Sequence, residues 1–479
     1  MSTQTSAEPT LATHSKTTTI VDLDRKHVLH PMHGFDTINN EGALAIDRAE
    51  GAYIFDTDGN RYLDAVGGMW CTNIGTGRQE MADAIAEQVM KCNYSNMFVD
   101  MTNDVTVQLC AKLAELAPGN LNHVSLTCGG STANDTAFRL IQFYNACRGK
   151  PEKKAIISRK DSYHGTSLLT MSLGGKDMDR CPEFGYLDTD GLNAIHSYKV
   201  SSPNFYRYGG DLSEQQFAEN LYLEFVDKVA ELGGPGNVAA FLAEPILGAG
   251  GVVPPPCNYI KRIWEFCKAN DILYWSDEVV TGFGRCGEWF VSESLYGIQP
   301  DIIVSAKGLS SAYIPMGACI FSDEIWDVIA ESDQGRMFLN GYTYGGHPVG
   351  SAACLKNIEI IEREKILEHV RDTGAYFRTQ LETLYDLEIV GDVRGSHFMA
   401  CVEFVKNSDT KEIFPPELDI GKVVSNFADQ MGLMVRPIVN LNVMSPPLIL
   451  TREECDFIIA TLRKAIVSAT EKMKAEGHL

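Results

Sequence analysis

Residues 272–280 read Ile-Leu-Tyr-Trp-Ser-Asp-Glu-Val-Val, an apolar run that ends at two adjacent acids, Asp277 and Glu278. A short apolar run bounded by polar residues is typical of a strand buried on both faces, as in a parallel sheet. The same pattern returns at residues 301–305, which end just before Lys307. Open α/β sheets bind ligands at the carboxyl ends of their strands, so these two stretches indicate an α/β sheet that carries a site.

Further apolar runs of this kind alternate with helical stretches along the chain. Residues 123–127, 155–158, 238–243, 272–276, 301–305 and 318–321 are predicted to be buried strands. Met81, Ile85 and Val89 recur at helical spacing, and a second helical set of apolar residues ends before Pro118-Gly119. This order predicts a mostly parallel sheet with helices on both faces.

The two ends of the chain follow other patterns. The first twenty residues are polar and aperiodic, so we expect a loose arm there. Beyond residue 341 come a long helical region, strand-like stretches at 398–405 and 433–438, and a final helix from Thr451. That helix begins with a capping box, Thr451-x-x-Glu454. The tail therefore predicts a smaller α+β domain.

Composition excludes several classes of protein. The chain has 479 residues and a formal net charge of −22, which disfavours nucleic acid and anionic membrane surfaces as partners. It contains neither a long apolar segment for a membrane span nor the pattern of a signal peptide. Its 13 cysteines include no CxxC pair, which favours reduced thiols and a cytoplasmic location. The repeat His27-x-x-His30-x-x-His33 lacks a usual ligand spacing, so we assign no metal site.

Two segments other than 272–280 follow predicted strands and could hold a ligand. Gly129-Gly130-Ser131 precedes a helical pattern and offers free backbone N–H groups and a hydroxyl, as a phosphate site requires. Tyr163-His164-Gly165 offers a ring on which a flat ligand could stack. Taken alone, the first is equally compatible with an ordinary strand-to-helix turn, and the second is more typical of core packing than of a stacking platform.

The acids at 277–278 allow three interpretations. The site of an ATPase is excluded, because the Gly-Lys pairs of this chain lack the preceding glycine and the following hydroxyl. A dinucleotide site is suggested by Gly282-Phe-Gly-Arg-Cys-Gly287, but no clear helical pattern follows these glycines. The third is a buried carboxylate that pairs with a protonated heterocycle. Lys307, among small and apolar residues, is either structural or an amine nucleophile with a lowered pKa.

Together these parts are those that hold pyridoxal phosphate as an imine. In this order the chain resembles the class III aminotransferases of the fold type I pyridoxal-phosphate enzymes, specifically the omega-amine:pyruvate branch. The marks are Gly-Gly-Met-Trp70-Cys, Gly130-Ser131-Thr-Ala-Asn, Tyr163-His-Gly, Ala-Glu244-Pro-Ile, Asp277-Glu-Val-Val-Thr-Gly-Phe-Gly-Arg285, Ala-Lys307-Gly, Gly-Tyr-Thr343-Tyr-Gly-Gly-His-Pro, and Arg436 ahead of Ser-Pro-Pro447. They extend from about His30 to the final helix.

The resemblance implies a role for each marked residue. Lys307 would form the Schiff base and then move the substrate proton, and Asp277 would keep the ring nitrogen protonated. The other residues implied to bind the cofactor are Gly130 and Ser131 at the phosphate, Thr343 at the same phosphate from a partner subunit, Tyr163 and Val279 on the two sides of the ring, and Glu244.

The resemblance also implies how substrates bind. Trp70 would line the substrate pocket with Met97 and Phe98 of a partner subunit nearby, and Arg436 would pair with a substrate carboxylate. The site would then lie between the subunits of a homodimer, or of a tetramer. Members that use glutamate carry a glutamate where this chain has Ala249, which favours pyruvate as the acceptor.

The family also sets the expected domain limits and leaves alternatives open. We expect residues 1–75 to form an arm and part of the small domain, 76–340 the cofactor-binding domain, and 341–479 the rest of the small domain. The expected activity is transfer of an amino group from an omega-amino acid or primary amine to pyruvate. An aminomutase or decarboxylase with the same cofactor, a nicotinamide-dependent dehydrogenase that uses residues 282–287, and a non-catalytic binding protein remain alternatives.

Overall fold

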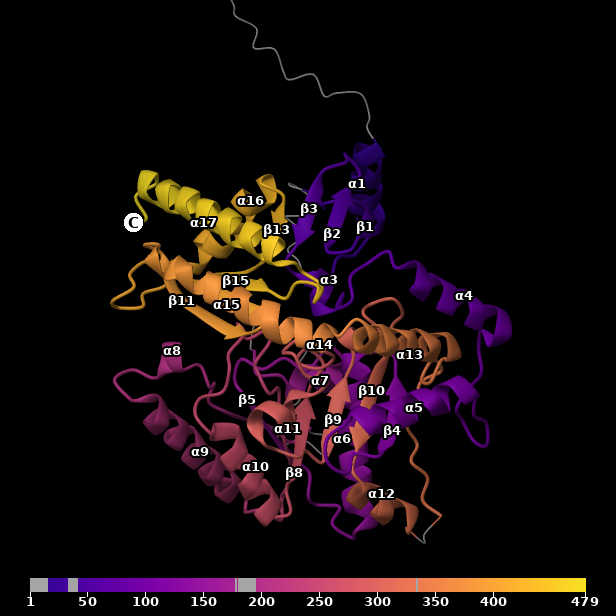
Figure 1. Ribbon diagram of the computed structural model, residues 1–479. Helices are drawn as coiled ribbons and strands as arrows, with labels where there is room; N and C mark the ends of the chain where they lie inside the picture. The colour runs from indigo at the N-terminus through magenta and orange to yellow at the C-terminus, as the bar shows by residue number, and fades with distance from the viewer. Residues whose placement is uncertain (1–15, 33–41, 177–178, 180–194, 333–334) are drawn as a thin grey trace, which may run out of the picture.

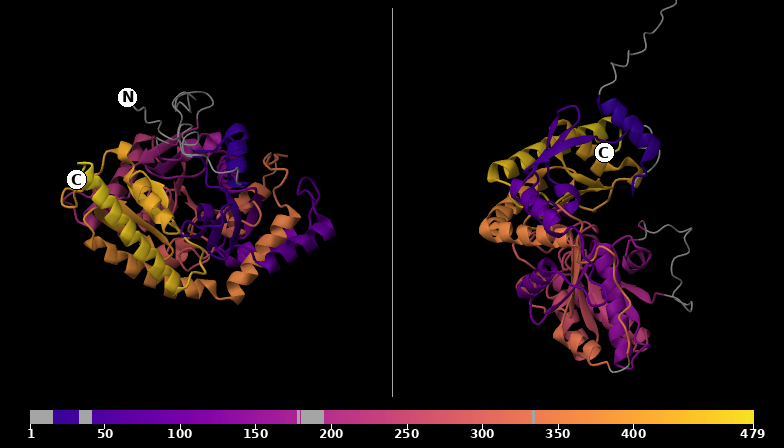
Figure 2. Two further views of the ribbon diagram at one scale, coloured as in Figure 1. Left: turned by 90° about the horizontal axis from the view of Figure 1, so that it is seen from above. Right: turned by 90° about the vertical axis from the view of Figure 1, so that its right-hand side faces the viewer.

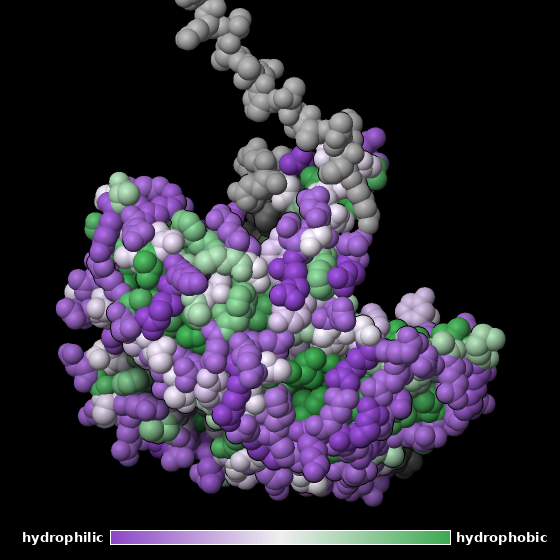
Figure 3. All heavy atoms as spheres, turned by 45° about the horizontal axis from the view of Figure 1, so that its top comes forward, coloured by the Kyte–Doolittle hydropathy of each residue, from purple (hydrophilic) through white to green (hydrophobic). Residues whose placement is uncertain are grey.

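The computed structural model describes residues 16–32, 42–176, 179, 195–332 and 335–479. In Figure 1 the lower part of the molecule is a large sheet with helices around it. The upper part combines segments from both ends of the chain. The surface in Figure 3 is mainly hydrophilic with scattered apolar patches. Among the helices of the described residues, none is both long and apolar enough to cross a membrane.

Seven of the described strands form the large sheet, in the order β4-β10-β9-β8-β7-β5-β6. Their bounds are β4 (His123–Thr127), β5 (Ala155–Arg159), β6 (Ser197–Val200), β7 (Val238–Ala243), β8 (Leu273–Asp277), β9 (Ile302–Ser305) and β10 (Gly317–Phe321). Strand β10 is antiparallel to both of its neighbours, and the other pairs are parallel. The prediction of an α/β fold with a mostly parallel sheet is confirmed.

Helices bury both faces of this sheet, as the apolar runs predicted. On β5, Ile156 packs in a cluster with α6 (Gly130–Cys147), whereas its neighbour Ile157 packs in the cluster that contains α9 (Glu214–Glu231) and α10 (Tyr259–Ala269). On β9, Val304 faces α6 and Ile303 faces α5 (Asp104–Leu116) and α13 (Pro348–Arg363). Successive strand residues point to opposite faces, so a strand with helices on both sides must be apolar throughout.

The helices of this part lie at the following bounds. They are α4 (Gln79–Cys92), α5 (Asp104–Leu116), α6 (Gly130–Cys147), α7 (Leu168–Leu173), α8 (Phe205–Tyr208), α9 (Glu214–Glu231), α10 (Tyr259–Ala269), α11 (Val291–Tyr296), the 3-10 turn η3 (Lys307–Leu309) and α12 (Asp323–Ala330). The predicted helices near Met81 and before Pro118 are confirmed as α4 and α5.

The second part contains two smaller sheets, β1-β2-β3-β13 and β11-β12-β15-β14. The strands are β1 (Ile46–Glu50), β2 (Tyr53–Asp56), β3 (Arg61–Asp64), β11 (Val390–Ser396), β12 (Met399–Phe404), β13 (Leu433–Met434), β14 (Arg436–Ile438) and β15 (Leu441–Met444). The helices and turns are α1 (Lys16–His27), α3 (Gly67–Trp70), α13 (Pro348–Arg363), α14 (Ile366–His369), η4 (Val370–Gly374), α15 (Ala375–Glu382), η5 (Thr383–Asp386), η6 (Pro416–Leu418), α16 (Ile420–Gln430) and α17 (Arg452–Ala475).

The two ends of the chain meet in one of these sheets. Strand β13 pairs with β3 in parallel, with Leu433 opposite Leu63. In Figures 1 and 2 the indigo N-terminal strands lie beside the yellow C-terminal helices. The capping box at Thr451 is present at the start of α17. The domain boundaries at residues 75/76 and 340/341 remain our prediction.

Three details of the sequence prediction were wrong. The chain is helical from Lys16, not loose through residue 20, and basic residues in the last turn of α1 favour that helix; residues 1–15 lie outside the described residues. The stretch 433–438 is two strands in different sheets, because the chain changes partner at Val435. Strand β6 was missed because it is a four-residue sheet-edge strand, Ser-Tyr-Lys-Val, with no apolar run.

Candidate active site

Five segments singled out in the sequence meet at one edge of the large sheet. Strands β5, β7, β8 and β9 run in parallel, and β4 points the same way because both β4 and β9 are antiparallel to β10. Their carboxyl ends therefore lie at the same edge. The ends of these strands and the segments that follow them carry Gly130, Tyr163, Glu244, Asp277 and Lys307.

Asp277 ends strand β8 and is 4% exposed. Its Oδ2 atom lies 2.9 Å from Asn134 Nδ2 and 2.8 Å from His164 Nδ1, and its Oδ1 atom accepts a hydrogen bond of 3.1 Å from the Val279 N–H. Donors on both oxygens compensate for the desolvation of a buried carboxylate and fix its direction. No role was predicted from the sequence for Asn134 or His164. Asn134 is only one of several residues on the buried face of α6, and nothing in the sequence marks it as a partner of Asp277.

Lys307 lies in the turn that follows β9 and has a left-handed backbone, with φ of 44°. Such a conformation costs about 1–3 kcal/mol for a residue with a side chain and persists only where the surrounding structure imposes it. Within the described part of the chain, no hydrogen bond or ion pair is made by Lys307 Nζ, which lies 5.6 Å from the centroid of the Trp70 ring. Burial lowers the pKa of Lys307, although attraction by Asp277, Cys71 and Glu244 opposes the shift. A lowered pKa favours the neutral amine, which is the form that acts as a nucleophile.

The N-terminus of α6 forms an anion cradle next to these groups. A Cβ added at Gly130 would lie 3.1 Å from a methyl group of Val279, which therefore packs directly against the cradle. A Cβ added at Gly165 would lie 2.4 Å from Ser131 Oγ, and that oxygen accepts a hydrogen bond of 3.1 Å from the Thr166 N–H. The close backbone approach and the positive end of an 18-residue helix suit a phosphate group.

Glu244 connects two walls of the site through backbone groups. One carboxylate oxygen accepts a hydrogen bond from the Tyr163 N–H at 3.0 Å, and the other accepts one from the Gly248 N–H at 2.7 Å. A Cβ at Gly248 would lie 2.8 Å from the Trp70 ring, so the loop after Glu244 supports that ring. Burial and the nearby Asp277 raise the pKa of Glu244. The contacts of Glu244 position Tyr163 and Trp70.

Arg436 lies at the start of β14, and its Nη1 atom is 2.8 Å from Met69 Sδ, in the segment that carries Trp70. Burial lowers the pKa of Arg436, and attraction by Tyr163 and Asp179 opposes this. Among the described residues, no carboxylate forms an ion pair with the guanidinium. It is free to bind an anionic substrate group.

Thr343 and Phe98 form a separate group on the surface. The Thr343 carbonyl accepts a hydrogen bond of 2.9 Å from Tyr94 Oη, and a Cβ at Gly341 would lie 2.8 Å from the Phe98 ring. Thr343 is exposed, as is Phe98. Their expected contribution to a partner's site stays a prediction.

The structure rejects a dinucleotide site at Gly282-Phe-Gly-Arg-Cys-Gly287. No helix starts directly after these glycines, and a Cβ at Gly284 would lie 2.9 Å from a methyl group of Leu448. The side chain of Arg285 is fully buried and donates hydrogen bonds to Asn73 Oδ1 and to the carbonyl of Phe398. The loop is filled by protein atoms and joins the two parts of the molecule.

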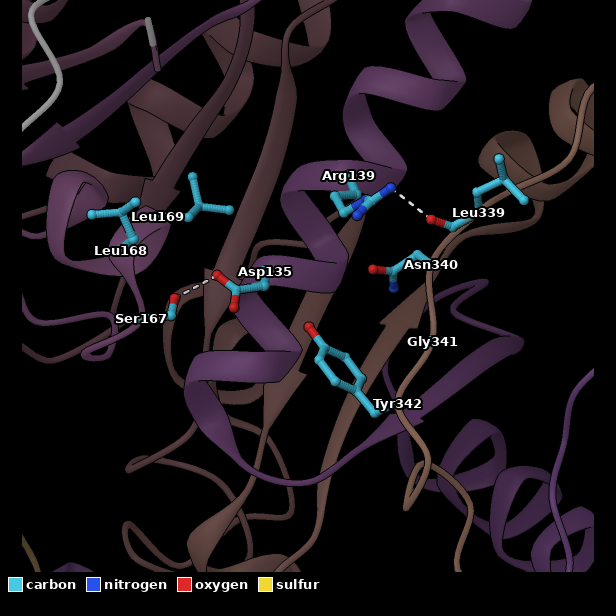
Figure 4. Close-up of a pocket in the computed structure, with 9 residues that line it drawn as sticks. All are labelled: Asp135, Arg139, Ser167, Leu168, Leu169, Leu339, Asn340, Gly341 and Tyr342. Carbon is cyan, nitrogen blue, oxygen red and sulfur yellow. Dashed lines mark hydrogen bonds between the residues drawn. The ribbon is translucent and has the colours of Figure 1, made fainter. Parts of the chain in front are cut away.

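A cavity of about 420 Å³ lies further along α6 and contains none of the predicted site residues (Figure 4). It is lined by Asp135, Arg139, Ser167, Leu168, Leu169, Leu339, Asn340, Gly341 and Tyr342. Its charged groups are already engaged, since Asp135 accepts a hydrogen bond from Ser167 Oγ and Arg139 donates one to the Leu339 carbonyl. We assign it no role in the site.

Comparison with known proteins gives consistent matches. The family model of class III aminotransferases matches residues 37–466. A putrescine–pyruvate aminotransferase of Pseudomonas aeruginosa is 40% identical over 455 residues, which are 95% of this chain and 97% of that protein. A mitochondrial gamma-aminobutyrate transaminase of Oryza sativa is 35% identical, with 90% and 83% of the two chains covered.

Solved structures agree with these matches. The (S)-enantioselective omega-transaminase of Thermomicrobium roseum has a TM-score of 0.89 and 37% identity, with 95% of this chain and 100% of that chain covered. The omega-transaminase of Pseudomonas jessenii, solved in complex with PMP, has a TM-score of 0.90 and 33% identity, with 96% and 100% covered.

Proposed function

Because the chain belongs to the class III aminotransferases and is thus a pyridoxal-phosphate-dependent aminotransferase, we propose that it transfers an amino group from an omega-amino acid or primary amine to pyruvate. The observation that carries this proposal is the placement of Lys307 and Asp277. A lysine amine without a partner among the described residues and a buried carboxylate lie at one sheet edge, beside a helix N-terminus that suits a phosphate.

The residues at this edge fit the cofactor group by group. The cradle at Gly130 and Ser131 suits its phosphate, Asp277 suits its ring nitrogen, and Lys307 suits its aldehyde. When bound, pyridoxal phosphate supplies a ring that accepts the electron pair left on the substrate carbon after a proton leaves.

Each side chain then has a task that its contacts support. Lys307, whose pKa burial lowers, would hold the cofactor through its aldehyde and, once the substrate amine has displaced it, would take the proton from the substrate carbon and return it. Asp277, held by Asn134 and His164, presents a carboxylate to the ring nitrogen. Tyr163 and Val279 would flank the ring of the cofactor, and Trp70 would close the substrate side.

Arg436 is proposed to bind the carboxylate of pyruvate. Ala249 stands where glutamate-using members carry a glutamate, and its methyl group cannot pair with the guanidinium when substrate is absent. The pyruvate named for the Pseudomonas aeruginosa relative supports this acceptor.

Replacing Arg436 by alanine is expected to raise KM for pyruvate about 10- to 100-fold, the value of a charge-assisted hydrogen bond. KM for a donor without a carboxylate, such as putrescine, should stay within about twofold, since it makes no bond to the guanidinium. Steady-state kinetics on both substrates measures this. Arg452→Ala, which removes an exposed arginine paired with Asp372, is the control and should change neither KM. Equal increases for pyruvate and putrescine would contradict the assignment.

We also propose that the chain forms a homodimer through an apolar surface around Tyr94, Met97 and Phe98. The ring of Tyr94 lies 6.3 Å from that of Tyr344, and a Cβ at Gly346 would lie 2.7 Å from Met97. Val99 in the same loop is fully exposed although apolar. An exposed cluster of apolar side chains is typical of a protein–protein interface. This cluster lies next to the loop that carries Thr343.

Val99→Asp should weaken the dimer at least about tenfold, because an unpaired charge would be buried at the interface. Val99 has φ of 61°, a conformation that Asp and Asn adopt more easily than Val, so neither replacement should damage the fold of one subunit. Val99→Asn, which is neutral, is the matched control. Sedimentation equilibrium with parallel activity assays is the measurement, and it also distinguishes a dimer from a tetramer. A wild-type chain that is monomeric and active at micromolar concentration would refute the shared site.

Product analysis tests the reaction itself. With a primary amine and pyruvate, alanine and the carbonyl product of the donor should appear in equal amounts. An aminomutase or a decarboxylase transfers no nitrogen to pyruvate, so product without alanine would replace the transaminase proposal by one of these.

A further inference from the structure

The turn that carries Lys307 is an unusual piece of backbone. Lys307, Ser311 and Ala312 all have left-handed conformations, with φ of 44°, 48° and 65°. Its internal hydrogen bonds include one of 2.9 Å from the Leu309 N–H to the Ala306 carbonyl. Residues with side chains adopt this conformation only where the surroundings impose it. Other parts of the molecule must therefore hold the turn.

Asn357, on helix α13, supplies a large part of that restraint. It is fully buried, and its Nδ2 donates hydrogen bonds of 2.9 Å to the Gly308 carbonyl and 3.0 Å to the Leu309 carbonyl. Its Oδ1 accepts a hydrogen bond of 2.6 Å from Ser311 Oγ. One amide group thus binds three residues of the turn that begins at Lys307, namely Gly308, Leu309 and Ser311.

The same contacts extend to the substrate side of the site. Ser311 Oγ accepts a hydrogen bond of 3.3 Å from the Ile74 N–H, four residues after Trp70. On the opposite side of the turn, a Cβ at Gly308 would lie only 2.3 Å from Asn73 Nδ2. Asn73 is itself fixed by a hydrogen bond of 2.7 Å to the Phe283 carbonyl. The turn is thus enclosed between two buried asparagines.

We propose that Asn357 is a positioning residue that holds the Lys307 turn in its left-handed form and so directs the Lys307 amine toward Asp277 and the cofactor. This inference rests on the proposed role of Lys307. Without the Asn357 amide, the Leu309 carbonyl would be buried unpaired and the Gly308 carbonyl would keep only a bond of 3.3 Å from the Ser311 N–H, and the turn would relieve this by moving. A shift of about 1 Å in a reacting group can cost about 10²-fold in rate.

The test compares Asn357→Asp and Asn357→Leu with the same changes at Asn442. Asn442 is a matched control because it is also fully buried and also donates to two backbone carbonyls, those of Gly421 at 2.8 Å and Leu441 at 3.1 Å. The measurements on each holoenzyme are kcat, KM, thermal unfolding, and the pH at which the visible absorption of bound pyridoxal phosphate changes.

Asn357→Asp is expected to lower kcat about 30- to 100-fold with KM within about threefold, and Asn357→Leu to lower kcat further. The pH midpoint of the visible absorption should shift in both, because it reports the surroundings of Lys307. The Asn442 variants should lose similar thermal stability while kcat stays within about threefold and the midpoint is unchanged. If the Asn357 and Asn442 variants changed kcat and the pH midpoint equally, the proposal would be overturned.

Ser311→Ala keeps the test decisive where the Asn357 variants fail to fold. It removes one of the three hydrogen bonds to the Asn357 amide, and kcat should fall about three- to tenfold with the same direction of midpoint shift. An unchanged kcat and midpoint would overturn the proposal. Failure of the proposed function is a separate result, because it would appear as normal turnover and an unchanged visible band in Lys307→Ala.

Discussion

Lys307→Ala should lower kcat by at least about 10⁴-fold, since one amine supplies both the bond to the cofactor and the proton transfer, and proton transfer alone contributes about 10²–10⁴-fold. The cradle at α6 and the Asp277 carboxylate are intact in this variant, so we expect it to bind pyridoxal phosphate without the visible spectrum of the wild type. Single-turnover kinetics with an amine donor and the visible spectrum measure the two effects.

Lys153→Ala is the matched control for this experiment. Lys153 is also buried, and burial lowers its pKa as it does for Lys307. Its Nζ, however, donates to the Pro235 carbonyl at 2.9 Å and lies 3.5 Å from Asp271 Oδ2, so it is engaged. Its loss should lower thermal stability and leave kcat of the folded enzyme unchanged. Wild-type turnover in Lys307→Ala would reject the assignment.

Asp277→Asn should lower kcat about 10²- to 10³-fold, the usual effect of removing one fixed group that stabilises charge in the transition state. The replacement has the same shape, and Asn134 and His164 remain beside it. Without the negative charge the ring nitrogen would no longer be held protonated, so the ring would accept the electron pair less readily. We expect affinity for pyridoxal phosphate to fall much less than kcat, as titration of the apoenzyme would measure.

The neighbouring acid gives the control. Glu278 is fully buried, and burial raises its pKa. It accepts hydrogen bonds of 2.8 Å from the Val291 N–H and 3.0 Å from the Ser292 N–H, at the start of α11. Glu278→Gln should therefore lower stability and spare kcat per folded molecule. If Glu278→Gln lost more turnover than Asp277→Asn, the roles of the two acids would have to be exchanged.

The sequence alone predicted the sheet well because its strands are buried on both faces. The range predicted for β7, 238–243, agrees in full, since Val-Ala-Ala-Phe-Leu-Ala is apolar throughout. A pattern of hydrophobicity records burial and not the partner of a strand. It therefore could not show that residues 433–434 pair with β3 while residues 436–438 join β15.

The same limit applies to the site. Asp277 and Lys307 were found because each stands at the end of an apolar run, and the resemblance to a family added Glu244, Thr343 and Arg436. Asn134 and Asn357 carry no such signal: each lies on the buried face of a helix, where its side chain reaches a segment distant in sequence. Asn134 and Asp277, for example, are 143 residues apart in the sequence, so their contact exists only in the folded chain.

The most direct test of the central claim is the visible absorption of the purified holoenzyme, recorded first with a primary amine and no acceptor, and then after addition of pyruvate. We expect the visible band to bleach with the amine and return with pyruvate, with alanine formed in proportion to the band recovered. A band that bleaches but does not return with pyruvate would contradict the acceptor. A protein that gains no visible band after soaking in pyridoxal phosphate would contradict the assignment of Lys307 and with it the whole account.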